Sequence, residues 1–170
     1  AVGLLFLEKP AGHTSDCPRV LSVGESSDAH HMSSPHPEGL GAVLAMNNAL
    51  RLASIKPSAV DYLNLHATAT RINDRIEAKA IFQVFGDSVP CSGTKGITGH
   101  TLGAAGAIEA IAALVALEHQ FIPGTCGLDQ TDEDCRCRVV KDSLPNQRLK
   151  TVMSNSFGFG GNNASVILSS

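Results

Sequence analysis

The sequence predicts an α/β fold in which a mixed, mostly parallel β-sheet is flanked by helices. Short apolar runs of strand length alternate with segments whose apolar residues recur every three or four positions. The last two apolar runs, 151–154 and 164–168, flank a glycine-rich segment at 158–161, which indicates an antiparallel hairpin. With 170 residues and 43% hydrophobic content, the size suits a single domain spanning residues 1–170.

The first third of the chain contains two expected strands and one expected helix. The apolar run 2–8 resembles a buried strand, and 19–24 is a second, partly β-branched strand. The stretch 25–37 is rich in Ser, His and Pro and is expected to form a surface loop. From 38 to 53, apolar residues at three- and four-residue spacings predict an amphipathic helix, and Pro37 favours its start.

The rest of the chain continues the alternation of expected strands and helices. The run 62–65 predicts a short strand ending at His66, and 74–85 predicts a helix that Gly86 stops. The Ala-rich segment 102–117 is apolar nearly all round, which predicts a helix buried between layers. Four further strands and one loop are expected, the strands at 89–92, 138–140, 151–154 and 164–168 and the loop at 121–137.

Charge and hydropathy exclude several classes of protein. The formal net charge is -3, and the 13 Lys and Arg residues are scattered, so no basic face for nucleic acid is predicted. No apolar run reaches the roughly 18 to 20 residues that a bilayer requires, and the first ten residues lack the pattern of a secretion signal. We therefore expect a cytoplasmic protein without a membrane or nucleic-acid partner.

The five cysteines are odd in number and irregularly spaced, which favours reduced thiols in a chain of this size. Cys135 and Cys137 are separated by one residue and no paired Cys/His set accompanies them, so solvated loop thiols are favoured over metal ligands. The glycine-rich segment 93–99 fits neither the P-loop nor the dinucleotide pattern. We expect no metal and no bound cofactor.

Three loops that follow predicted strands form the candidate site. Ligands of open α/β sheets bind beyond the carboxyl ends of strands, where His66, loop 95–100 and loop 157–161 would meet. A lone histidine there is more often structural than catalytic, so the hypothesis depends on the combination. His100 precedes a predicted helix, whose free N–H groups favour a developing anion. Tight packing of the glycine-rich segment, with His100 capping the helix, is an equally open interpretation.

Three long motifs, in order, resemble the elongating β-ketoacyl-acyl-carrier-protein synthases of the thiolase-like superfamily. Residues 63–70 are similar to the family's Asn-x-His-Gly-Thr-x-Thr block, 94–106 to its Lys-x-x-x-Gly-His block, and 154–163 to its closing Phe/Gly loop. The resemblance extends over nearly the whole chain. It implies the C-terminal half of such an enzyme, with a mixed, mostly parallel five-stranded sheet flanked by helices.

The resemblance also implies a catalytic group. His66 and His100 would be the two active-site histidines, and Lys95 would lie beside them and help to orient His100. Glu77, on the helix after His66, would support the site. In the implied reaction, malonyl-carrier protein loses CO2 and the resulting enolate attacks an acyl thioester. Two hydrogen-bond donors on the thioester oxygen, the Nε2 atoms of the histidines, suit the charge that develops there.

A second set of residues would contact the substrate. Thr68 and Thr70 match threonines that meet the phosphopantetheine arm of the acyl carrier protein, which is part of the substrate rather than a cofactor. Phe157 and Phe159 would belong to the acyl pocket, with Phe159 as its gate.

The chain departs from the family pattern at several positions. Ala67 replaces the usual Gly after the first histidine, Ala69 replaces a common Ser, and Asn162-Asn163 replaces a Thr-Asn pair. No cysteine lies in a block like that of the family's nucleophile, and Cys91 falls in a predicted strand as a core residue. The resemblance therefore implies a missing N-terminal half that supplies the nucleophile, and a chain that alone is inactive.

The expected partners follow from the same resemblance. They are acyl- and malonyl-carrier protein, the missing N-terminal half and, in the full-length enzyme, a second copy. Two alternatives stay open: a non-catalytic partner of the chain-length-factor kind, against which His66, His100 and Lys95 argue, and a module that only binds acyl chains or carrier protein. The pathway, fatty-acid, polyketide or polyene synthesis, is not distinguished.

Overall fold

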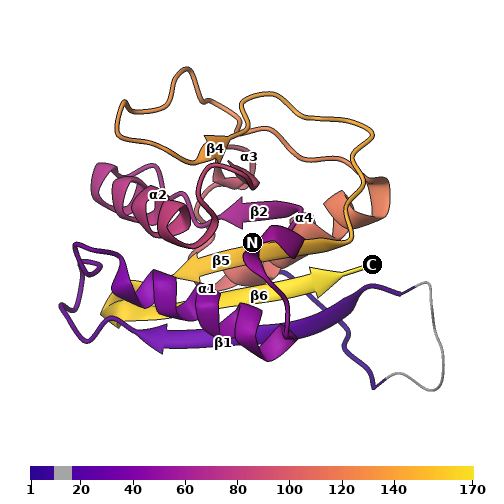
Figure 1. Ribbon diagram of the computed structural model, residues 1–170, viewed down its shortest axis with the longest axis horizontal. Coiled ribbons are helices and arrows are strands. Elements are labelled where there is room, and N and C mark those ends of the chain that lie inside the picture. Colours follow the sequence, from indigo (N-terminus) through magenta and orange to yellow (C-terminus); the bar gives the residue numbers. More distant parts are fainter. Residues whose placement is uncertain (10–16) are drawn as a thin grey trace.

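The computed structural model describes residues 1–9 and 17–170, and its centre is one six-stranded sheet (Figure 1). The strand order is β1-β6-β5-β2-β3-β4. The strands are β1 (Arg19–Ser27), β2 (Tyr62–Leu65), β3 (Pro90–Gly93), β4 (Arg138–Val139), β5 (Thr151–Phe157) and β6 (Asn162–Ser169). β6 is antiparallel to both of its neighbours, whereas β5, β2, β3 and β4 are mutually parallel. The expected mixed, mostly parallel sheet and the closing hairpin are confirmed.

The sheet has six strands rather than the expected five. The edge strand β4, expected at 138–140, is only two residues long, and it pairs with β3 through the registers Pro90↔Arg138 and Cys91↔Val139. Val140, which the sequence also placed in this strand, still donates its backbone N–H to Cys91 O at 2.8 Å. The expected strand is therefore confirmed, although one this short adds few ladder hydrogen bonds to the edge of the sheet.

The expected strand at 2–8 is wrong. Residues 1–9 have no regular secondary structure, and Leu4 and Phe6 are 88% and 89% exposed. Gly3 lies so close to Ala107 that a methyl group on Gly3 would be 2.8 Å from the Ala107 Cβ. An extended apolar segment becomes a strand only when another strand satisfies its backbone groups, and no strand of the described chain pairs with this one.

Helices cover both faces of the sheet. α1 (Leu40–Ala53) and α2 (Arg71–Phe85) lie on one face, and α4 (Ala105–His119) lies on the other (Figure 1). The helix expected at 38–53 starts at Leu40, and the helix expected at 74–85 starts earlier, directly after Thr70. Gly86, with φ +65, ends α2 as the sequence predicts.

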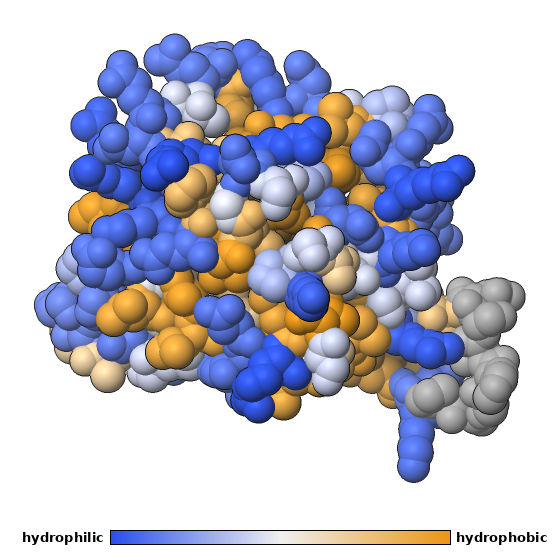
Figure 2. Space-filling view, viewed as in Figure 1, coloured by the Kyte–Doolittle hydropathy of each residue, from blue (hydrophilic) through white to orange (hydrophobic). Residues whose placement is uncertain are grey.

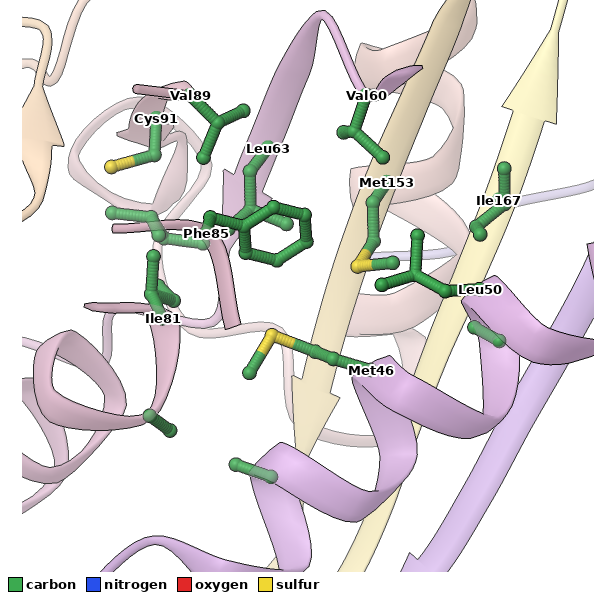
Figure 3. Packing of buried hydrophobic residues seen from close by; sticks show 14 residues of the cluster. Met46, Leu50, Val60, Leu63, Ile81, Phe85, Val89, Cys91, Met153 and Ile167 are labelled. Atoms are coloured by element: carbon green, nitrogen blue, oxygen red, sulfur yellow. The ribbon is translucent and has the colours of Figure 1, made fainter. Parts of the chain in front are cut away.

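The two-residue periodicity of the strands divides the core into two clusters. On the α1/α2 face, Met46 of α1 and Phe85 of α2 pack with Leu63, Met153 and Ile167 of three adjacent strands (Figure 3). On the opposite face, the neighbours of these strand residues pack against α4: Tyr62, Val152 and Leu168. β2 is therefore buried on both faces, which fixes the position of the loop that follows it.

α4 was expected to be buried between layers, and this is only half confirmed. Ala113 and Leu117 pack on the sheet, but Val115 is 39% exposed and Leu102, just before the helix, is 76% exposed. The 18 residues Leu102–His119 have a mean hydropathy of 1.5, long and apolar enough by length and composition to cross a membrane. This corrects the expectation that no run reaches that length. One such helix is weak evidence, because core helices share these properties and α4 packs on the sheet.

Exposed apolar side chains are not confined to α4. Figure 2 shows apolar residues among polar ones on the face that includes α1. On α1 itself, Leu40, Leu44 and Leu52 are each about half exposed.

Candidate active site

The carboxyl ends of three parallel strands place the predicted site residues at one edge of the sheet. His66 follows β2, Lys95 follows β3, and Phe157 is the last residue of β5. The His66 ring centroid lies 5.6 Å from that of His100 and 5.9 Å from that of Phe157, both in edge-on geometry. The structure therefore confirms that the three loops converge.

His66 is a buried, neutral imidazole. It is 6% exposed. Burial, together with the nearby charges of Lys95 and His100, lowers the pKa of His66 to about 3. Lys95 Nζ lies 3.3 Å from His66 Nδ1 and also donates to the His66 carbonyl oxygen. An ammonium group only donates, so Nδ1 is the acceptor and the ring proton is on Nε2.

Lys95 is held by a residue that the sequence analysis missed. Its ammonium forms a buried ion pair with Glu109 of α4, and the two side chains are 6% and 1% exposed. Burial raises the pKa of Glu109, which the Lys95 charge opposes. The available signal was Glu109 itself, an acidic residue within an Ala-rich apolar helix. Lys95 was expected to orient His100, but the contacts that the structure gives it are with His66 and Glu109.

Glu77 supports the site from α2, as expected. It is 3% exposed, and its two carboxylate oxygens accept the backbone N–H groups of His66 at 2.8 Å and Ala67 at 2.7 Å. Burial raises the pKa of Glu77 to about 7, against the effect of these two hydrogen bonds. The carboxyl group therefore fixes the backbone of the loop on which the His66 ring is mounted.

Ala67 occupies a conformation that suits glycine. Its φ is +32, in the region where a Cβ is unfavourable. Its methyl group lies against Gly93 of β3, because a methyl on Gly93 would be 2.7 Å from the Ala67 Cβ. The substitution of the family's Gly by Ala is thus accommodated by the absence of a side chain at Gly93.

His100 lies at the open side of the site. The residue is exposed, and its Nδ1 accepts the backbone N–H of Leu102 at 3.2 Å. This bond assigns the remaining ring proton of the neutral form to Nε2. Both interpretations of His100 therefore apply in part: it caps the turn before α4, and its Nε2–H is free to donate to a ligand. Two imidazole donors beside each other suit an oxygen that gains negative charge.

The expected substrate residues do not all lie against the histidines. Thr68 is half-buried and Thr70 is exposed just before α2, with their Oγ1 atoms 2.9 Å apart. Phe157 lies against His66, whereas Phe159 is 85% exposed in the 3₁₀ turn η3 (Phe159–Gly161). The structure thus brings Phe157, and not Phe159, to the histidines.

The loop that contains Phe159 is tied to Asp28, a second residue that the sequence analysis missed. The Asp28 backbone N–H donates to Gly161 O at 2.8 Å, and Asp28 Oδ1 accepts from Asn163 Nδ2 at 2.9 Å. Gly160 donates its N–H to Met32 O at 2.8 Å. In the sequence, the only signal for this contact was an acidic residue, Asp28, within a loop rich in Ser, His and Pro.

Cofactor and metal ligands are a separate question. Across residues 1–9 and 17–170, no group of three or more His, Cys, Asp or Glu side chains is arranged to hold a metal ion. Cys91 is a buried residue of β3, as expected.

Comparison with known proteins identifies the family. Residues 19–129 match the sequence model of the β-ketoacyl synthase C-terminal domain. The chain belongs to the β-ketoacyl synthase family. The matched range includes His66, Glu77, Lys95, His100 and Glu109.

Curated relatives and solved structures agree with this assignment. A mitochondrial 3-oxoacyl-[acyl-carrier-protein] synthase of Arabidopsis thaliana is 46% identical over 157 residues, covering 89% of this chain and 34% of its own length. 3-Oxoacyl-[acyl-carrier-protein] synthase 2 of Coxiella burnetii is 44% identical over 153 residues, covering 88% and 37%. The chain therefore spans about a third of the length of the curated relatives it matches.

Two solved structures show the same thiolase-type fold. A ketosynthase in complex with its chain length factor from Xenorhabdus doucetiae superimposes with a TM-score of 0.83 at 49% identity, covering 89% of this chain and 39% of that one. A β-ketoacyl synthase from Burkholderia phymatum gives 0.84 at 33% identity, covering 88% and 36%. The β-ketoacyl synthase assignment therefore holds for both the sequence and the three-dimensional structure.

Proposed function

We propose that the protein is a 3-oxoacyl-acyl-carrier-protein synthase, an acyltransferase that joins an acyl group to malonyl-carrier protein by decarboxylative condensation. The observation that supports this best is the pair of imidazoles, His66 and His100, whose ring centroids lie 5.6 Å apart and whose Nδ1 atoms are both engaged as acceptors, which leaves Nε2–H donors for a ligand. The reaction belongs to fatty-acid synthesis or to a related polyketide or polyene route.

The chemistry of the malonyl group suits this pair. When the carboxylate leaves as CO2, its electron pair moves onto the malonyl thioester and forms an enolate oxygen. Two N–H donors stabilise this oxygen more than the neutral carbonyl of the substrate, which lowers the barrier. Because the pKa of His66 is about 3, this ring stays neutral near pH 7 and donates without first losing a proton.

The enolate carbon then attacks the acyl thioester and expels a thiolate. In our proposal this acyl group is attached to a cysteine of the N-terminal half, in keeping with the family. Lys95, Glu109 and Glu77 act as positioning residues, because they hold His66 by its Nδ1, its carbonyl oxygen and its backbone N–H.

The substrate residues are proposed from their places around the histidines. Thr68 and Thr70 carry neighbouring hydroxyls suited to hydrogen bonds with a phosphopantetheine amide, and Phe157 is a wall beside His66. Phe159 is proposed as a gate on the loop that Asp28 ties down. The partner would be the acyl carrier protein. One structural relative, 30% identical with a TM-score of 0.84, is titled as a type II polyketide ketosynthase in complex with an acyl-carrier protein.

The same proposal includes a cytoplasmic, homodimeric full-length enzyme. The exposed apolar side chains on α1 and near the start of α4 support association with further protein surface.

The test measures condensation of acyl- and malonyl-carrier protein, and malonyl decarboxylation separately, in the full-length protein. His66→Ala and His100→Ala are each expected to lower both rates by roughly 100- to 1,000-fold, the usual effect of removing one oxyanion donor. The matched control is His119→Ala, an exposed histidine at the end of α4. Unchanged rates in both variants would refute the proposal. An inactive parent protein would favour a partner of the chain-length-factor kind.

A further inference from the structure

Three of the five cysteines gather at the β3–β4 edge of the sheet. Cys91 lies in β3, and Cys135 and Cys137 precede β4, which pairs with β3 at Cys91. The expectation that Cys135 and Cys137 are solvated loop thiols is wrong, because both are half-buried. Cys137 packs against the core cluster to which Cys91 belongs.

The Cys135 and Cys137 sulfur atoms lie 3.4 Å apart. A disulfide bond is about 2.05 Å long, so an approach of about 1.4 Å would join them. The two side chains are separated by Arg136, whose guanidinium carbon lies 3.8 Å from the centre of the Phe82 ring on α2. The segment has no regular secondary structure at 135–136 and bends at Cys137, just before β4. Arg136 is held against α2, and the thiols on either side of it lie next to each other.

Neighbouring contacts hold this segment in place. Arg75 of α2 pairs with Asp134 at 3.1 Å, and Cys135 donates its backbone N–H to Asp132 O at 2.9 Å. The ion pair is exposed and contributes little stability by itself. Together with the contact of Arg136, these interactions nevertheless limit the conformations of the segment on both sides of the thiol pair.

The two thiols differ in acidity. The neighbouring thiols of Cys91 and Cys135 together outweigh the effect of burial and lower the pKa of Cys137 to about 7. Burial and the neighbouring charge of Cys137 raise the pKa of Cys135 to about 11. At neutral pH one member of the pair is therefore partly a thiolate, which is the nucleophilic form, and the other remains a thiol.

We propose that Cys135 and Cys137 form a reversible dithiol–disulfide site that reacts with hydroperoxides, a property separate from the condensing activity. The Cys137 sulfur attacks the terminal peroxide oxygen; the O–O bond breaks, the alkoxide or hydroxide leaves and takes up a proton, and Cys137 becomes a sulfenic acid. The Cys135 sulfur then attacks the Cys137 sulfur. The S–O bond breaks, the S–S bond forms, and the departing hydroxide combines with the Cys135 proton to give water.

The balance is two thiols plus one hydroperoxide, giving one disulfide, one alcohol (or water) and one water. Reduction by a small dithiol, through exchange at the disulfide, restores both thiols and oxidises the reductant. A metal site is a weaker explanation of the cluster, because the described residues contain no group of three or more ligands in metal-binding geometry.

The tryptic map of the sequence allows a direct test. Trypsin separates the three clustered cysteines into peptides 80–95 (Cys91), 96–136 (Cys135, together with Cys126) and 137–138 (Cys137). The full-length protein is treated with hydrogen peroxide, unfolded, alkylated at its remaining thiols and digested without reductant. We expect peptides 96–136 and 137–138 to remain joined, with one alkyl group on Cys126, and to separate after treatment with dithiothreitol.

Three variants assign the roles, with far-UV circular dichroism to confirm that each is folded. Cys126→Ser, at an exposed cysteine, should keep the cross-link. Cys137→Ser should lose it. Cys135→Ser should also lose it, but a sulfenic acid on Cys137 should then be trapped by dimedone. The proposal is overturned if wild-type Cys135 and Cys137 both remain alkylatable after peroxide, or if the bond joins peptides 80–95 and 137–138. It is also overturned if dimedone labels Cys135 in Cys137→Ser as fast as it labels Cys137 in Cys135→Ser.

Discussion

Lys95 Nζ lies 3.3 Å from His66 Nδ1, within a buried ion pair that Lys95 forms with Glu109. The first residue of α3 (Lys95–Thr98) therefore determines which nitrogen of the His66 ring is protonated, and α4 holds that lysine in place. This chain of contacts connects three elements that the sequence separates by 29 and 14 residues.

Lys95→Met should destabilise the protein by about 3–5 kcal/mol, because it leaves the Glu109 carboxylate buried without a partner. The double variant Lys95→Met/Glu109→Gln should recover most of this loss in urea unfolding. It should not recover malonyl decarboxylation, since the His66 tautomer is no longer fixed. Lys141→Met, at an exposed lysine, is the matched control. Equal activity of the double variant and the wild type would contradict the role of Lys95 in positioning.

Glu77→Gln tests the carboxyl group under the His66 loop. The pKa of the Glu77 carboxyl group is about 7 in the folded chain and near 4.5 in the unfolded chain, so the folded state holds the proton more tightly. Between pH 4.5 and 7 this group's contribution to stability therefore falls as pH rises. The difference in unfolding free energy, wild type minus Glu77→Gln, should decrease over that range. His66 acts in the opposite direction but is present in both proteins, so it cancels.

The measurement is urea unfolding at pH 5, 6 and 7. Because the Gln amide has one acceptor oxygen for two backbone N–H groups, we also expect a loss of roughly 1–3 kcal/mol at pH 5. Glu118→Gln, at an exposed site on α4, serves as the control. A wild-type advantage that grows with pH would show that the Glu77 pKa is not raised.

Gly93→Ala should clash with the Ala67 methyl group, since the added carbon would lie 2.7 Å from it. We expect a loss of about 1–3 kcal/mol, the usual cost of overpacking. In the double variant Ala67→Gly/Gly93→Ala most of this loss should disappear, giving a coupling of at least about 1 kcal/mol in denaturant unfolding. Gly103→Ala is the matched control, because nothing lies within 4 Å of the added methyl. Additive effects of the two substitutions would rule out the contact.

The 170-residue chain by itself should associate and bind a hydrophobic dye. Val2, Leu4, Phe6 and Leu102 are more than three-quarters exposed, and α4 is covered on one side only. Sedimentation velocity and anilinonaphthalene sulfonate fluorescence check this. Replacing Leu4 and Phe6 by Ser should reduce dye fluorescence, whereas a similar pair of substitutions at the exposed polar residues Gln130 and Thr131 should not. A monomer that binds no dye would argue against an interaction surface here.

The sequence by itself determined the layered α/β arrangement and the meeting of His66, Lys95 and Phe157. Local periodicity distinguishes strands from helices, and the carboxyl ends of parallel strands meet at one edge whatever the side chains are. Glu77 was also expected in advance, because the family resemblance implies an acidic residue on the helix that follows His66.

Only the tertiary structure decided which groups pair. It placed Lys95 against His66 rather than His100, added Glu109 and Asp28 to the site, and brought the half-buried Cys135 and Cys137 to the edge of the sheet that contains Cys91. It also left residues 2–8 without a strand partner. The physical reason is the same in each case: a hydrogen bond, an ion pair or a strand ladder joins residues far apart along the chain. Its formation depends on how whole elements pack, which local sequence patterns do not specify.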